Sequence, residues 1–187
     1  MEIKEITKNR KIVGVISAYK SQLKKSGKIS DLDIKNIKKG IKIVGLNENI
    51  IDKDIDDLTI SEKWKIELLT KLHMDTIIVG NLSSNLILKD REFIKKLLKK
   101  LAIDYNKKIV VIDNDVNSFV NLTENIIVLK DKKIIYETAD FYDEKLYEFI
   151  EKPKIIEFID YVNKKDRKLN NNLEIYELIK DIYRSVS

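Results

Sequence analysis

Residues 76–113 have the sequence TIIVGNLSSNLILKDREFIKKLLKKLAIDYNKKIVVID, and this stretch decides the class of fold. It begins with the run Thr76–Val79 and closes with the run Ile109–Ile112, both almost entirely isoleucine and valine. Short, continuous apolar runs of this kind are typical of strands that are buried on both faces of a parallel sheet. Between them, Asp90–Ala102 repeats apolar residues at helical spacing. The stretch therefore predicts a strand, a helix and a second, parallel strand.

Runs of the same kind lie on both sides of this unit. They predict further strands at Ile12–Ile16, Ile41–Leu46, Ile126–Leu129 and Lys133–Tyr136. Helical patterns separate some of them: Ser61–Leu72, with Ser61 as its expected N-cap, and the short segment Asp115–Leu122. Strands that alternate with helices predict an α/β fold in which a mainly parallel sheet is flanked by helices. We expect Trp64 and Phe93 to belong to its core.

The pattern changes after Tyr136, where no further strand is expected. Three amphipathic helices are predicted at Asp143–Glu151, Pro153–Lys164 and Leu173–Tyr183. Pro153 suits the first positions of a helix, where its missing N–H costs nothing. We therefore expect two parts, a core over residues 1–140 and a helical C-terminal extension over residues 141–187.

Composition excludes several classes of protein. The chain has 187 residues, of which 43% are hydrophobic and 36% charged, enough apolar material for a core. It contains no cysteine and a single histidine, so thiolate chemistry, disulfides and multi-histidine metal sites are excluded. No run approaches the roughly 20 apolar residues of a membrane span, and the first residues do not resemble a signal peptide. We expect a cytoplasmic protein.

The charge does not indicate a nucleic-acid partner. The net charge is only +5, and basic residues stand beside acidic ones along most of the chain. The densest basic run, Lys95–Lys100, falls within a helical pattern and has no neighbouring aromatic residues on which bases could stack. We interpret it as a solvated helix face. The aspartates of residues 52–57 lack the glycine and glutamate of a calcium loop, so we predict no metal site there.

One dipeptide after the first strand has the chemistry of a phosphate site. Lys20 and Ser21, followed by Gln22, provide a lysine and a hydroxyl in the order that phosphate and magnesium require. The glycines that let a backbone curl around phosphate oxygens are missing in front of them. Taken alone, the Lys-Ser pair indicates phosphate binding only weakly.

The order of the later segments resembles the nucleotide-binding domain of ATP-binding cassette (ABC) proteins over residues 1–140. Leu58–Lys65 is similar to the family's signature segment, Thr76–Leu86 to its Walker B strand and D-loop, and Ile112–Asp115 to its switch segment. Ile126–Ile134 is similar to its closing hairpin. Pro153–Phe158 is more loosely similar to the C-terminal helices of ATPase subunits in energy-coupling-factor transporters. The resemblance implies a P-loop NTPase fold and a nucleotide site.

The resemblance also assigns site residues. Lys20, Ser21 and Gln22 correspond to nucleotide-binding positions. The signature-like positions are Leu58, Thr59, Ser61, Glu62 and Lys63. ATP and magnesium are the implied ligands, and the shortened loop predicts that any binding of them is weak.

Departures from the family pattern argue against catalysis. Gly80 stands where the family has a magnesium-binding aspartate, Asn81 where it has the catalytic glutamate, and Asn114 where it has the switch histidine. The D-loop acid is replaced by Ile87. Few residues precede the first strand, and about a dozen separate Leu46 from the signature-like segment, so reduced antiparallel and helical subdomains are expected. We predict no catalytic residue and no metal ligand.

Three hypotheses for the function stay open. In the first, the chain is a degenerate ABC-type subunit without hydrolytic activity that acts as a structural or regulatory partner. A chain without a working P-loop can still complete the site of an intact cassette, and Ser61, at the start of its helix, would then face the partner's γ-phosphate. In the second hypothesis, the chain is a weak ATP-binding subunit whose own site a partner completes. In the third, it is a soluble protein-interaction module that keeps only the fold. The expected partner is a second ABC ATPase, in a homo- or heterodimer, with a membrane transporter subunit that would hold the assembly at the inner face of the membrane.

Overall fold

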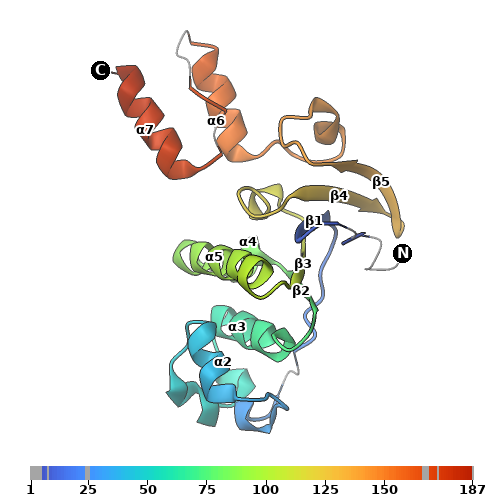
Figure 1. Ribbon diagram of the computed structural model, residues 1–187, viewed down its shortest axis with the longest axis vertical. Coiled ribbons are helices and arrows are strands. Elements are labelled where there is room, and N and C mark those ends of the chain that lie inside the picture. The colour runs from blue at the N-terminus through green and yellow to red at the C-terminus, as the bar shows by residue number, and fades with distance from the viewer. Residues whose placement is uncertain (1–5, 8, 24–25, 166–168, 172, 187) are drawn as a thin grey trace.

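The computed structural model describes residues 6–7, 9–23, 26–165, 169–171 and 173–186 (Figure 1). Its centre is a five-stranded sheet in the order β2-β3-β1-β4-β5. The four strands β1 to β4 are mutually parallel, and β5 pairs antiparallel with β4. The strands are β1 (Ile12–Ile16), β2 (Thr76–Gly80), β3 (Lys108–Asp113), β4 (Asn125–Lys130) and β5 (Lys133–Thr138). The predicted mainly parallel sheet is confirmed.

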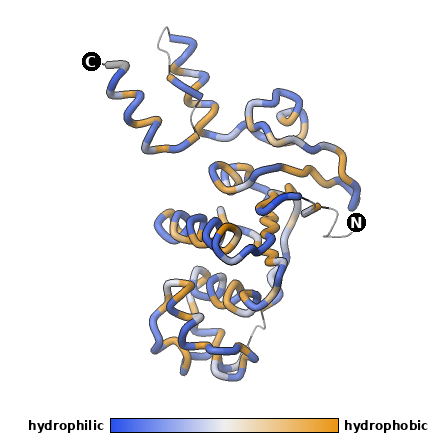
Figure 2. Tube along the Cα trace, viewed as in Figure 1, coloured by the Kyte–Doolittle hydropathy of each residue, from blue (hydrophilic) through white to orange (hydrophobic). Residues whose placement is uncertain are grey.

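The two faces of the sheet contribute to different hydrophobic clusters. Alternate residues of β3 point to opposite faces, so Ile109 and Val111 join the main core while Val110 joins a smaller cluster that includes Ile6. The main core is completed by α3 (Ile60–Lys71) and α5 (Leu88–Asp104), which lie next to each other along the sheet in Figure 1. Both faces of the sheet are therefore apolar where β1, β3 and β4 lie, and Figure 2 shows hydrophobic segments at the centre of the sheet.

The predicted strand Ile41–Leu46 is wrong, because this segment belongs to a helix. The helix α2 spans Ile37–Ile43 and ends in a turn at Gly45, whose φ is +70°. Ile37, Ile41 and Val44 recur at helical spacing and pack into the main core. The β-branched residues concealed this periodicity, and burial of one helical face decided the outcome.

Short helices fill the segment between β1 and α3. The 3-10 helices η1 (Ile29–Asp31), η2 (Glu48–Asp52) and η3 (Ile55–Asp57) surround α2 in the lower part of Figure 1. Ile29, Ile50 and Ile55 are almost fully buried. This agrees with the expected reduction of the helical subdomain. The antiparallel pairing of named strands is confined to β4 and β5 in the described residues.

Two further helices were predicted too long. Within Asp115–Leu122 only the 3-10 helix η4 (Val116–Ser118) forms, because the Asp115 side chain accepts from Asn117 N and sets a tight turn. Phe119 follows it, fully buried against β1, where a Cβ on Gly14 would lie 2.9 Å from the ring. Asp143–Glu151 likewise forms only the 3-10 helix η5 (Glu144–Glu148). The four-residue helix α4 (Leu82–Asn85) follows β2.

The C-terminal part consists of α6 (Lys154–Asn163) and α7 (Ile175–Val186), at the opposite end of the molecule from α2 in Figure 1. Pro153 is the N-cap of α6, one position earlier than expected. Phe141, Leu146 and Ile156 join the main core. The division at residue 140 stays a prediction.

Two aromatic residues expected in the core behave differently. Trp64 is buried, as predicted, but the prediction for Phe93 is wrong because 40% of it is exposed, where it lies across Gly45. Within the described residues, no helix combines the length and the apolar character that crossing a bilayer requires.

Candidate functional site at the carboxyl edge of the sheet

The carboxyl ends of β1, β2 and β3 lie side by side and form the edge at which open α/β sheets bind ligands. Ser17 N donates to Asp113 O at 3.3 Å, and Asn81 N donates to Ile112 O at 3.1 Å. Gly80 and Asn81 therefore lie at this edge, and Asn114 directly follows the end of β3 there. The chemistry of the edge then depends on what lies over it.

The segment Ser17–Leu23, here called the strap, leaves β1 without regular secondary structure. Its Tyr19 ring lies directly on Gly80, where an added Cβ would come within 2.2 Å of Tyr19 Cγ and 2.6 Å of Ile112 O. Asn81 Nδ2 donates to Tyr19 O at 3.3 Å. The strap thus covers the end of β2.

A buried carboxylate on α3 anchors the strap. Glu67 accepts hydrogen bonds from the hydroxyls of Tyr19 and Ser21, and from Gln22 N at 3.2 Å. Lys71, one helical turn further along α3, donates to Glu67 Oε1 at 2.7 Å and to Ile78 O at 2.9 Å. Two of the three predicted nucleotide-binding residues, Ser21 and Gln22, are therefore held by the protein itself.

The charge state of this anchor follows from its contacts. Burial by itself raises the pKa of Glu67, but the hydrogen bonds from Lys71, Ser21 and Tyr19, with the charge of Lys71, outweigh burial and hold that pKa below its usual value. Burial, assisted by the bond to Glu67, raises the pKa of the Tyr19 hydroxyl. The anchor is a charged Glu67–Lys71 pair with a neutral tyrosine.

Lys20, the third predicted residue, is exposed, and its side chain has no hydrogen-bond or ion-pair partner in the described part of the chain. A phosphate cradle needs several free backbone N–H groups that converge on one point. In the strap, Gln22 N is bound to Glu67 and Leu23 N to Ser21 Oγ. Lys20 is therefore a single surface charge beside a backbone whose donors are partly occupied.

The end of β2 offers no carboxylate. Gly80 has no side chain, and its carbonyl accepts from Trp64 Nε1 at 2.6 Å. Asn81 adopts a left-handed backbone, with φ at 54°, and opens α4. Neither residue supplies an anionic oxygen for a cation or a base for water.

Asp113, at the end of β3, is the buried carboxylate that sequence analysis missed. It is 3% exposed and accepts from Ser83 N at 3.1 Å, Asp115 N at 3.1 Å, Ser118 Oγ at 2.7 Å and Ser83 Oγ. These donors occupy the acceptor sites of the Asp113 carboxylate. Because Ser83 lies in α4 and Ser118 in η4, the same bonds hold both helices against the sheet. Its neighbour Asn114 is exposed.

The residues present do not fit a magnesium–nucleotide complex. The strap covers the end of β2, that end has no carboxylate, and the oxygens of Asp113 already accept hydrogen bonds. Each of these observations argues against a bound magnesium ion. Among the described residues, no group of three or more metal-ligating side chains is present, including the aspartates of residues 52–57.

The signature-like segment starts α3, but the expected cap is wrong. Thr59, not Ser61, is the N-cap: it forms a capping box in which Thr59 N donates to Glu62 Oε2 at 2.8 Å and Glu62 N donates to Thr59 Oγ1 at 3.2 Å. Leu58 is buried, and Lys63 Nζ donates to Asp56 O at 3.2 Å. The first turn is therefore closed by its own side chains.

Ser61 also has a different partner from the one expected. Its hydroxyl donates to Asp90 of α5, and Lys65 Nζ lies 2.8 Å from the same carboxylate. Burial raises the pKa of Asp90, but the bonds from Lys65 and Ser61 lower it further than burial raises it. The backbone N–H of Thr59 lowers the pKa of Glu62. Two carboxylates thus flank the N-terminus of α3.

Comparisons with known proteins agree with this architecture. The chain is 24% identical over 152 residues to the energy-coupling factor transporter ATP-binding protein EcfA2 of Spiroplasma kunkelii, covering 78% of this chain and 50% of that protein. It is 26% identical over 149 residues to EcfA2 of Staphylococcus aureus strain RF122, covering 75% of this chain and 52% of the relative. The chain thus spans about half the length of these curated relatives. No protein-family model matches it.

Solved structures show the fold. The dimeric structure of MJ0796, a bacterial ABC transporter cassette, matches with a TM-score of 0.55 at 22% identity, over 74% of this chain and 67% of the other. CbiO1 of Clostridium perfringens, part of the ABC transporter complex cbiONQ, matches with a TM-score of 0.51 at 17% identity, over 82% and 62%. The fold is that of an ABC ATPase-like P-loop domain, which confirms the expected class and the similarity to energy-coupling-factor ATP-binding subunits.

Proposed function

We propose that the chain is an ABC-type subunit without hydrolytic activity, which acts as a structural or regulatory partner of an intact ATPase in a transporter. The observation that carries the proposal is the strap, which is tied to Glu67 and lies on Gly80 at the position where the family binds its metal. A domain that performs phosphoryl transfer keeps this edge open to nucleotide.

The chemistry of the edge supports the absence of hydrolysis. Phosphoryl transfer depends on charge neutralisation by lysine, metal and carboxylates, together with an oriented water. Gly80 cannot ligate a cation, and the amide of Asn81 cannot accept a proton from water. Asp113 has its oxygens committed to Ser83, Ser118 and Asp115 N. No described residue at the edge takes over these roles.

The similar proteins support a partner of the same fold. Those relatives are transporter ATP-binding proteins, and MJ0796 forms a dimeric cassette structure. We infer that this chain pairs with an intact cassette, and through it with a membrane subunit at the inner face of the membrane. The carboxylates of Glu62 and Asp90 at the start of α3 would repel a partner's γ-phosphate. A scaffolding role is therefore favoured over completion of the partner's site.

Phosphate release from Mg·ATP tests the catalytic part of the proposal. We expect wild-type protein and the Lys20→Ala variant to release phosphate at the rate of buffer, with an active ABC cassette as the positive control. Lys20 is chosen for substitution because it is exposed and has no bond to Glu67, so its removal should leave the strap in place. Release above background that is lost in Lys20→Ala would refute the proposal.

The partner is tested with an intact cassette that co-purifies with this chain. We expect a stable complex whose ATPase rate is the same with wild type and with Ser61→Arg. An ATPase rate that rises with the wild-type chain and falls to the basal value with Ser61→Arg would show instead that this chain completes the partner's site.

A further inference from the structure

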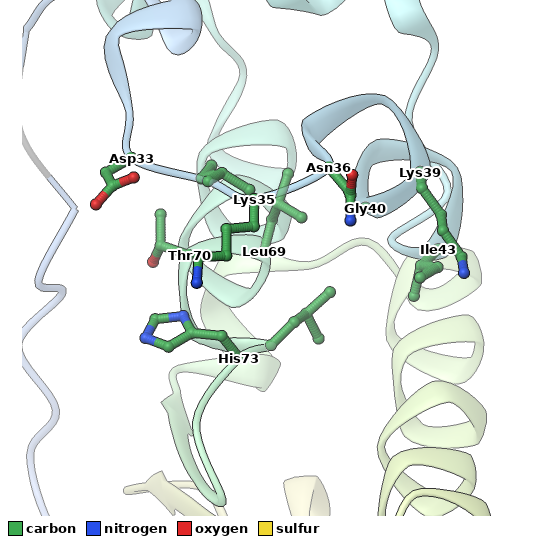
Figure 3. A pocket seen from close by; sticks show the side chains of 11 residues that line it. Asp33, Lys35, Asn36, Lys39, Gly40, Ile43, Leu69, Thr70 and His73 are labelled. Carbon is green, nitrogen blue, oxygen red and sulfur yellow. The ribbon is translucent and has the colours of Figure 1, made fainter.

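A cavity of about 460 Å³ lies between α2 and the C-terminal end of α3 (Figure 3). It is at the end of α3 opposite the Thr59 cap, and neither Glu67 nor Lys71, which hold the strap, lines it. Its volume falls in the range of about 300–1,000 Å³ that is typical of small-molecule sites. Neither the proposed function nor the resemblance uses this cavity.

The floor of the cavity is apolar because two helices approach closely. A Cβ on Gly40 would lie 2.3 Å from Leu69 Cδ1, so the missing side chain lets α2 lie directly on α3. Leu69 and Ile43 then face the cavity, with Leu72 beside them. This floor suits an apolar body of a few ring or chain carbons.

The rim of the cavity carries a surplus of positive charge. Lys35 and Lys39 have no ion-pair partner among the described residues. Lys42, on α2 like Lys39 but outside the cavity, lies 2.8 Å from Glu48. Figure 3 shows Lys35, Thr70 and His73 grouped on one side of the cavity and Lys39 on the other. Asp33 is the acidic residue of the rim.

From this arrangement we propose that the cavity binds a small organic anion, in which one carboxylate, phosphate or sulfonate group is joined to an apolar body. The anionic group lies near the Lys35 ammonium, with His73 on the same side of the cavity, and Lys39 on the other side adds to the positive charge that outweighs Asp33. The apolar body lies on Leu69 and Ile43. A dianion with no apolar part would leave the floor uncovered, and a cation would meet the two lysines.

The probe for the test is 8-anilinonaphthalene-1-sulfonate, which joins a sulfonate to aromatic rings, and its fluorescence is titrated against the native protein. We expect saturable binding of one molecule per chain. Lys35→Glu should weaken the affinity at least tenfold. The control is Lys38→Glu, three residues further along the chain on α2 but outside the cavity, which should change the affinity less than twofold. Circular dichroism confirms that both variants are folded.

A neutral probe separates the anion site from an apolar surface. N-phenyl-1-naphthylamine has the same rings without the sulfonate, and we expect it to bind at least tenfold more weakly and to be insensitive to Lys35→Glu. Three results would overturn the proposal: no saturable binding of the sulfonate, equal loss in Lys35→Glu and Lys38→Glu, or equal affinity for both probes.

Discussion

Substitution of Glu67 by glutamine is the sharpest perturbation of the strap, because it removes one charge and almost no volume. Glu67 and Lys71 are 9% and 5% exposed in their side chains, with 2.7 Å between Lys71 Nζ and Glu67 Oε1. In Glu67→Gln the Lys71 ammonium stays buried and keeps only neutral partners, Tyr19 OH and Ile78 O. Breaking a buried ion pair in this way costs about 3–5 kcal/mol.

The assay is urea unfolding followed by circular dichroism, and the matched control is Glu177→Gln. Glu177 pairs with Lys180 on the surface of α7, with side-chain exposures of 46% and 57%, so its loss should cost at most about 0.5 kcal/mol. We also expect Glu67→Gln to accelerate tryptic cleavage after Lys20, because the strap loses the charged acceptor for Tyr19, Ser21 and Gln22.

A double variant tests whether the loss of stability comes from the uncompensated Lys71 charge or from a general loss of packing. Glu67→Gln combined with Lys71→Met removes the uncompensated ammonium, so the double variant should be more stable than Glu67→Gln alone. The reasoning is refuted if Glu67→Gln costs less than about 1 kcal/mol, or if the two substitutions destabilise additively.

Three further predictions concern stability. Because the pKa of Glu67 is lowered in the folded state, its contribution to the unfolding free energy is present above its unfolded pKa of about 4.3 and is lost as the pH falls through its folded pKa. Glu67→Gln should therefore flatten the pH dependence of the unfolding free energy below about pH 5, and an unchanged slope would contradict this. Gly80→Ala should destabilise by about 1–3 kcal/mol in urea because its Cβ meets Tyr19 and Ile112 O, and wild-type stability would mean that the strap does not lie on Gly80. Thr59→Ala should cost about 1 kcal/mol by loss of the capping box and Thr59→Ser much less, whereas equal stabilities of the two variants would show that the cap is not formed.

The strands could be predicted from sequence because buried parallel strands have a simple signature. The boundaries expected for Ile12–Ile16 coincide with β1, and each of the other four strands extends its expected range by one or two residues. The failure at Ile41–Leu46 has a specific cause: isoleucine and valine serve a strand and a buried helix face equally, and packing of Ile41 against α3 selects the helix.

The strap could not be predicted, because it depends on a pairing distant in sequence. Ser21 and Gln22 look like phosphate ligands locally, but their hydrogen bonds go to Glu67, 46 and 45 residues away. Glu67 itself lies in a helix whose pattern gives no sign of a buried acid. The cap of α3, in contrast, is visible in the sequence, because Thr59 and Glu62 have the Thr-x-x-Glu spacing of a capping box.

Calorimetric titration of Mg·ATP into the wild-type protein tests the central claim most directly, because it asks whether the strapped edge of the sheet accepts a nucleotide. The account predicts no saturable heat with ATP up to about 1 mM, a concentration at which a site worth about −4 kcal/mol would be half filled. Saturable binding with a dissociation constant in the low-micromolar range, about −7 to −8 kcal/mol, would contradict it, above all if that binding disappeared in Lys20→Ala.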